Sequence, residues 1–109
     1  MEPLQSFKTL TGIKYDFTGS LSSGLVIYKK NYSVPISKQM IDIIRKEIQT
    51  NSPILMGANR DKPNTYSIGH VLKNIEGGNP QFLSYVVPLL VEEGFCKVNN
   101  KKPFILTIV

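Results

Sequence analysis

The sequence is poor in the residues from which most enzymes and metal sites are built. It contains one cysteine, Cys96, and one histidine, His70. A single cysteine excludes an intramolecular disulfide, and the two residues together leave too few ligands for a zinc site of the usual His and Cys type. No glycine-rich phosphate loop followed by Lys-Ser or Lys-Thr is present. We therefore expect a protein that is not an enzyme and that uses no metal or other cofactor.

Long hydrophobic runs are also missing. The longest fall far short of the ~20 residues that a membrane-spanning helix needs. No hydrophobic segment follows a basic start, so the chain shows no signal peptide. The single cysteine agrees with a reducing compartment, because small secreted proteins often carry several disulfides. We expect a cytoplasmic protein that does not bind membranes.

Acidic residues are scarce relative to basic ones. The chain has 13 Lys and Arg against 8 Asp and Glu, a net charge of +5 and a pI near 9.4. A basic balance of this size favours polyanionic partners such as nucleic acid. A basic protein without such a partner is the alternative. The 109 residues, 41% of them hydrophobic, fit a single domain, residues 1–109, with one modest core.

The first part of the chain is expected to form β-structure. Apolar and charged residues alternate over residues 13–17, the period-two pattern of a half-buried strand that turns inwards Ile13, Tyr15 and Phe17. A turn-rich segment, residues 19–24, precedes a second β-prone run. We predict a β-hairpin over residues 13–32, within an N-terminal β-hairpin extension that comprises residues 1–36.

Two amphipathic patterns predict the first two helices. Isoleucines and a methionine recur at helical spacing over residues 38–50, and Ser37 is a good N-cap for this helix. A short apolar run, residues 54–56, is expected to form a small strand or a buried connector. A second, shorter helix is expected further on, capped by Thr65 or Ser67.

The third helix has the clearest boundaries in the sequence. Asn79 is placed to cap it, and Pro80 to occupy its first position, where a missing N–H costs nothing. Gly94 is expected to end it. Between these limits, Pro88 removes a backbone hydrogen bond and clashes with the preceding turn. We therefore expect a kink there, or two short helices.

The chain ends in two apolar strands, residues 95–98 and 104–109, joined by a basic turn. Over residues 37–109 the order is helix, short apolar run, helix, tight turn at Gly77-Gly78, helix, strand, basic turn, strand. This order resembles the winged helix-turn-helix family of DNA-binding domains. The fold that the resemblance implies is α+β, a winged helix-turn-helix of three helices plus a C-terminal β-hairpin wing, preceded by the N-terminal β-hairpin.

The resemblance implies binding to double-stranded DNA, as a transcriptional regulator or as the DNA-recognition module of a larger DNA-processing system. In that family the third helix enters the major groove, and its exposed N-terminal half reads base edges. The residues at those positions are candidates for base reading: Asn79, Gln81, Ser84 and Tyr85. Basic residues around the helix are candidates for phosphate contacts: Arg60, Lys62, Lys73, Lys101 and Lys102.

Other features favour an alternative, a protein-protein interaction module that uses a winged-helix fold without binding DNA. The third helix contains no Lys or Arg and ends in Glu92-Glu93, whereas helices that read DNA usually carry positive charge. Tyr85 and Pro88 would then belong to a docking patch. Homodimerisation is compatible with either function, and paired third helices would predict a DNA site with two-fold symmetry.

A second basic and aromatic cluster belongs to the N-terminal segment. Its members are Lys14, Tyr28, Lys29, Lys30 and Tyr32. Aromatic residues interleaved with lysines suit contacts with single-stranded nucleic acid or with a phosphate backbone. The alternative is that these lysines protect an edge strand against aggregation.

Overall fold

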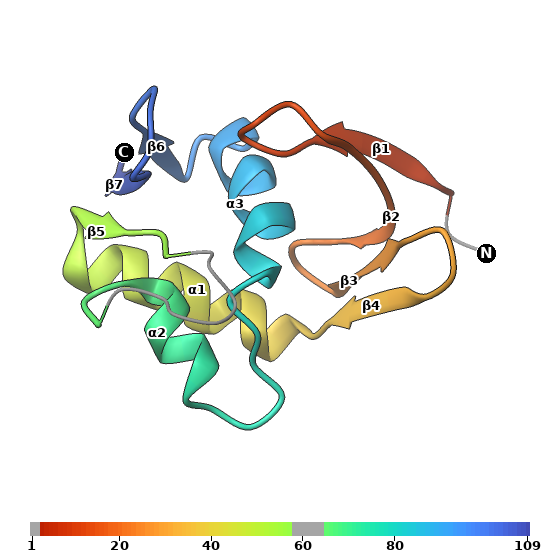
Figure 1. The fold of residues 1–109 in the computed structure, drawn as a ribbon, viewed down its shortest axis with the longest axis horizontal. Coiled ribbons are helices and arrows are strands. Elements are labelled where there is room, and N and C mark those ends of the chain that lie inside the picture. Colours follow the sequence, from red (N-terminus) through yellow and green to blue (C-terminus); the bar gives the residue numbers. More distant parts are fainter. Residues whose placement is uncertain (1–2, 58–64) are drawn as a thin grey trace.

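Over the residues that the structure describes, the fold comprises two antiparallel sheets and three helices (Figure 1). The computed structural model describes residues 3–57 and 65–109. The predicted α+β class is confirmed. The elements are β1 (Gln5–Lys8), β2 (Lys14–Ser20), β3 (Gly24–Tyr28), β4 (Ser33–Ile36), α1 (Lys38–Asn51), β5 (Ile54–Leu55), α2 (Ile68–Lys73), α3 (Phe82–Glu92), β6 (Cys96–Val98) and β7 (Ile105–Ile108).

The N-terminal segment forms a four-stranded sheet, so the prediction of a hairpin was incomplete. The strands pair in sequence order, β1-β2-β3-β4. The period-two pattern and the β-prone run revealed only β2 and β3, because these central strands bury alternate residues, whereas β1 and β4 are mostly exposed. Pro35 lies in β4, at the edge of the sheet, where a strand tolerates a missing N–H.

The inner face of this sheet carries most of its hydrophobic side chains. Tyr15 and Phe17 of β2 are buried there, as predicted, together with Ile27 of β3. Ile13 is 66% exposed, so its predicted inward position was wrong. It precedes β2 and lies in the β1–β2 turn, where its N–H donates to Thr9 Oγ1 at 3.1 Å.

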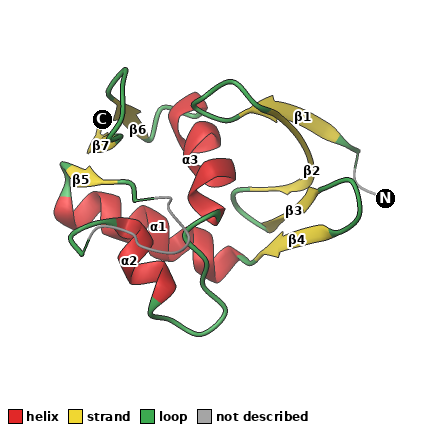
Figure 2. Cartoon of the chain, viewed as in Figure 1, coloured by secondary structure: helices red, strands yellow, loops and turns green. Residues whose placement is uncertain are grey.

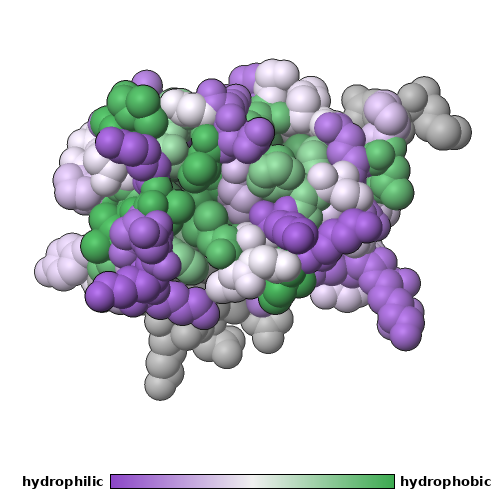
Figure 3. Space-filling model, turned by 90° about the horizontal axis from the view of Figure 1, so that it is seen from above, coloured by the Kyte–Doolittle hydropathy of each residue, from purple (hydrophilic) through white to green (hydrophobic). Residues whose placement is uncertain are grey.

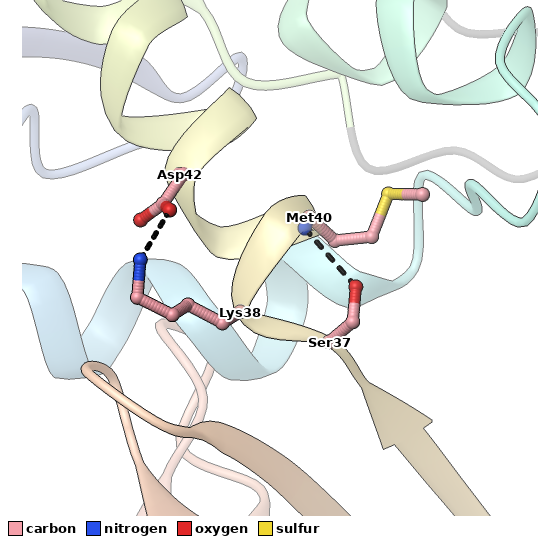
Figure 4. Close-up of polar contacts among 4 residues, drawn as sticks. All are labelled: Ser37, Lys38, Met40 and Asp42. Carbon is pink, nitrogen blue, oxygen red and sulfur yellow. Dashed lines mark hydrogen bonds and ion pairs between the residues drawn. The ribbon is translucent and has the colours of Figure 1, made fainter.

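The first helix, α1, confirms the predicted span and cap. The side chain of Ser37 accepts the N–H of Met40 at 3.2 Å, and Lys38 pairs with Asp42 at 2.7 Å across the first turn (Figure 4). The buried face of the helix comes from isoleucines spaced about one turn apart: Ile41, Ile44 and Ile48. This spacing places all three on one stripe that faces the core.

An N-cap begins the short second helix, α2, and a pair of glycines forms the turn after it. Of the two expected caps, Ser67 takes the role, and its side chain accepts the N–H of His70 at 3.2 Å. Gly77 has a φ of +79° in the turn that follows. A Cβ at Gly78 would lie 2.1 Å from the carbonyl oxygen of Leu72. A side chain at Gly78 would therefore collide with the end of α2, and one at Gly77 would strain the backbone of the turn.

The start of α3 differs from the prediction. The cap residue is Gln81, whose side chain makes no capping bond, two residues after the predicted cap. Asn79 nevertheless accepts the N–H of Gln81 on its side-chain oxygen at 2.9 Å. The next three N–H groups, from Phe82 to Ser84, bond to carbonyls three residues back. Such i→i+3 bonds mark a tight turn ahead of the α-helix proper.

The rest of α3 is one continuous helix that includes Pro88, and not two short helices. Its end has the expected glycine geometry. Phe95 N–H donates to the carbonyl of Leu90 at 3.0 Å, and Gly94 N–H donates to that of Val91 at 3.1 Å. With a φ of +84° at Gly94, these bonds form a Schellman motif. The predicted end of the helix is confirmed.

The C-terminal strands form the predicted hairpin. In it, β6 pairs with β7, and β5 adds to the other side of β7, giving the strand order β5-β7-β6. Ile54 lies opposite Leu106 in this pairing. The short apolar run after α1 is therefore a strand, one of the two expected forms, and it ties the end of α1 to the hairpin.

One hydrophobic core joins the two sheets and the three helices. In the fold, α3 lies between the four-stranded sheet and the pair α1 and α2 (Figures 1 and 2). Six of its eleven residues are buried: Phe82, Leu83, Val86, Val87, Pro88 and Leu90. A helix buried on this scale is a central element of the core and not an amphipathic helix at the surface.

Tyr15 connects the four-stranded sheet directly to α3. Its hydroxyl donates to the carbonyl oxygen of Tyr85 at 2.7 Å, and the two rings meet edge to face with centroids 5.2 Å apart. Burial raises the pKa of Tyr15, with a smaller contribution from Tyr85, so the hydroxyl keeps its proton in alkaline solution. The contact therefore combines an aromatic pair with a partly buried hydrogen bond.

Replacing Tyr15 by Phe removes this hydrogen bond and keeps the ring. We expect the free energy of unfolding to fall by about 1 kcal/mol, because a partly buried hydrogen bond is lost. Urea denaturation measures the change. Tyr28→Phe is the matched control, because Tyr28 is exposed, and we expect it to change stability by less than about 0.5 kcal/mol. Equal losses in the two variants would contradict the structural role of Tyr15.

Candidate nucleic-acid interface

The four residues predicted to read bases do not form one exposed surface. Gln81 is exposed at the start of α3, whereas Asn79 is half-buried and its side-chain oxygen already bonds to the backbone of Gln81. Ser84 and Tyr85 are half-buried and line a cavity with residues of the β1–β2 turn. Of the four, only Gln81 is fully accessible to a partner.

Tyr85 is held by contacts from the four-stranded sheet. Besides the ring of Tyr15, it meets Lys29, whose ammonium lies 4.6 Å from the centroid of the Tyr85 ring. To reach a base, the ring would have to give up this cation–π contact. The sequence did not reveal these contacts, because nothing local to Tyr85 indicates which residues of a distant sheet pack on it.

The residues predicted to contact phosphate lie in three places. Arg60 and Lys62 fall outside the residues that the structure describes. Lys73 is exposed at the end of α2, and Lys101 and Lys102 are exposed on the turn between β6 and β7. The two hairpin lysines are therefore adjacent and accessible, on the element where the winged-helix resemblance places backbone contacts.

Asn99 holds the hairpin turn in shape. Its side-chain amide donates to the carbonyls of Lys101 and Pro103 at 2.9 Å and 3.0 Å, and its oxygen accepts the N–H of Ile105 at 2.7 Å. One side chain thus bridges both ends of the turn that carries the lysines. This role was not predicted from the sequence, although asparagine is among the residues that commonly stabilise turns through backbone bonds.

The acidic end of α3 is partly neutralised. Glu93 forms an ion pair with Arg45 of α1, and the guanidinium of Arg45 also lies 4.9 Å from the centroid of the Phe95 ring. Glu92 remains exposed. The Glu92-Glu93 pair therefore presents less free negative charge beside the hairpin than the sequence suggested.

Cys96 is buried in β6, and burial raises the pKa of its thiol, with Glu93 adding to the rise and Arg45 opposing it. Over residues 3–57 and 65–109, no three His, Cys, Asp or Glu side chains are grouped so that they could hold a metal ion. Within the same residues, no helix is long and apolar enough to cross a membrane.

The docking patch proposed around Tyr85 and Pro88 has little exposed surface. Pro88 is buried in the core, and Tyr85 is half-buried beneath Lys29. On the face seen from above in Figure 3, hydrophobic and hydrophilic side chains are interspersed. These residues therefore do not present the apolar surface that the protein-interaction alternative requires.

Comparisons with protein-family models, curated proteins and solved structures gave no match to this chain.

Replacing Asn99 by Ala tests whether this side chain fixes the hairpin turn. We expect the loss of its three bonds to lower the free energy of unfolding by about 1 kcal/mol and to speed hydrogen exchange at the amide of Ile105. Both are measurable, by urea denaturation and by NMR. Asn100→Ala is the control, because this exposed neighbour is not one of the bonding groups of the turn. If exchange at Ile105 is unchanged in Asn99→Ala, the turn does not depend on Asn99.

Proposed function

We propose that this chain is a winged helix-turn-helix protein that binds double-stranded DNA mainly through the phosphate backbone. The observation that carries the proposal is the exposed pair Lys101 and Lys102, presented on a turn that Asn99 holds in place. Lysine side chains on such a turn neutralise phosphates and gain affinity from the release of counterions.

The arrangement of the elements supports the winged-helix part of the proposal. From α1 onward they follow the family order, with α2 and α3 separated by the Gly77-Gly78 turn and the hairpin placed last. The pairing of β5 with β7 anchors that hairpin to the helical part. The hairpin is thus fixed relative to the helices, as a wing must be to contact DNA beside them.

The burial of α3 favours backbone contacts over base reading. The helix carries no Lys or Arg, and only Gln81 of the four candidate base readers is exposed. Phosphate contacts fix position on a duplex but carry no direct sequence information. We therefore infer weak sequence preference, which fits the recognition module of a larger DNA-processing system better than a transcriptional regulator that must find one site.

The two lysines of the hairpin should dominate the salt dependence of duplex binding. Lys101→Gln with Lys102→Gln removes two phosphate contacts, so we expect the slope of log K against log salt to become shallower by about two. Fluorescence anisotropy with a labelled duplex at several salt concentrations measures the slope.

The matched control removes the same charge from α1, with Lys38→Gln and Lys46→Gln. We expect it to change the slope of log K against log salt by less than about half as much as the hairpin variant does. No binding of the wild-type protein even at low salt would reject DNA binding altogether. Equal effects of the two double variants would reject the hairpin as its site.

Gln81 tests how much sequence is read. We expect Gln81→Ala to change the free-energy difference between the best and worst duplexes of a random set by less than about 1 kcal/mol, which is the lower limit for one good bidentate base contact. Competition binding against the set provides the measurement. A loss of discrimination greater than this would show that α3 reads bases after all.

A further inference from the structure

We propose that the cavity between the β1–β2 turn and α3 binds a phosphate group. The cavity has a volume of about 170 Å³. The lining residues that matter for binding are Thr9, Thr11, Lys14, Lys29, Ser84 and Tyr85. The site uses none of the hairpin residues and does not depend on duplex binding by them.

The charge around this cavity is positive and uncompensated. Lys14 and Lys29 line it, and Lys8 lies directly opposite Lys14 in the pairing of β1 with β2. Within the described part of the chain, none of these three lysines forms an ion pair. Like charges placed opposite one another destabilise a sheet, so a bound anion would relieve this repulsion.

Among the described residues, the acidic residue of the four-stranded sheet forms no ion pair with these lysines. Residues 3–36 contain four lysines and a single acidic residue, Asp16. That carboxylate accepts a hydrogen bond from the hydroxyl of Ser6 at 2.6 Å. No carboxylate lines the cavity, so the lining side chains carry no negative charge that would repel a bound anion.

Hydroxyl groups supply neutral donors beside the ammonium groups. Thr11 Oγ1 lies 3.2 Å from Thr9 Oγ1, and Thr9 Oγ1 already accepts the N–H of Ile13. Ser84 adds a third hydroxyl to the lining of the cavity. Ammonium groups and hydroxyl donors, with no carboxylate beside them, are suitable partners for an oxyanion such as phosphate.

Lys29 is pre-positioned at this site. Its ammonium lies 4.6 Å from the ring centroid of Tyr85, and its backbone N–H donates to the carbonyl of Tyr32 at 2.8 Å. Both ends of the residue are thus held, which reduces the conformational entropy lost when an anion binds. The adjacent Lys30 does not line the cavity.

The size of the cavity limits what it can hold. Pockets for drug-sized ligands usually measure about 300–1,000 Å³, so a cavity of about 170 Å³ fits a group of a few heavy atoms and not a whole nucleotide. The group can belong to a nucleic-acid strand or to a small phosphorylated molecule. The chemistry that the site recognises, a phosphate, is the same in both cases.

The test is an NMR titration of the isotope-labelled protein with inorganic phosphate, with the ionic strength held constant by chloride. We expect saturable shifts at the amides of Thr11, Lys14 and Ser84. Lys29→Gln should weaken this binding roughly tenfold, as expected for one charge-assisted bond. Lys30→Gln, which removes one positive charge at the adjacent residue, should leave the affinity for phosphate unchanged. Shifts that do not saturate, or equal weakening by both variants, would overturn the proposal.

A second pair of titrations identifies the source of the phosphate. One uses a short single-stranded DNA, and the other uses glycerol phosphate. Tighter binding of the DNA at the same amides, weakened by Lys29→Gln, would assign the site to nucleic acid. Binding of glycerol phosphate alone would assign it to a small molecule. If neither ligand shifts these amides, the cavity is not a phosphate site, whatever the hairpin lysines do with duplex DNA.

Discussion

The packing of the four-stranded sheet against α3 is the constraint on which the rest of the structure depends. Tyr15 provides its polar part, with a hydroxyl bonded to the Tyr85 carbonyl, and the buried face of α3 provides its apolar part. Because the other side of α3 meets the remaining helices, the helix becomes the centre of the core. A helix in that position stabilises the whole fold, and few of its side chains remain accessible to a partner.

This constraint also shapes the proposed function. If α3 cannot offer many side chains to the major groove, affinity for DNA must come from elements that remain exposed, and the C-terminal hairpin has the charge and the ordered turn to supply it. The sheet that covers Ser84 and Tyr85 creates, at the same junction, a small basic cavity. We propose that the hairpin and the cavity each bind phosphate groups, and that Gln81 is the one residue of α3 that could read a base.

Local sequence patterns predicted much of this fold. The features that could not be predicted depend on contacts between residues far apart in the sequence. Ser37, Ser67 and Gly94 act as helix boundaries through bonds to nearby backbone, so their patterns are visible in the sequence. The edge strands β1 and β4 bury too few side chains to produce a periodic pattern. The candidate site was harder to predict, because the contact of Lys29 with Tyr85 joins residues far apart in the sequence and depends on how the sheet packs.

The most direct test of the central claim is the NMR footprint of a DNA duplex on the isotope-labelled protein. We predict that the largest amide shifts fall on the hairpin turn, residues 99–105, and that the amides of α3 beyond Ser84, which lines the basic cavity, change little. The opposite pattern, with large shifts along the exposed side of α3 and small shifts at Lys101 and Lys102, would contradict backbone binding through the hairpin.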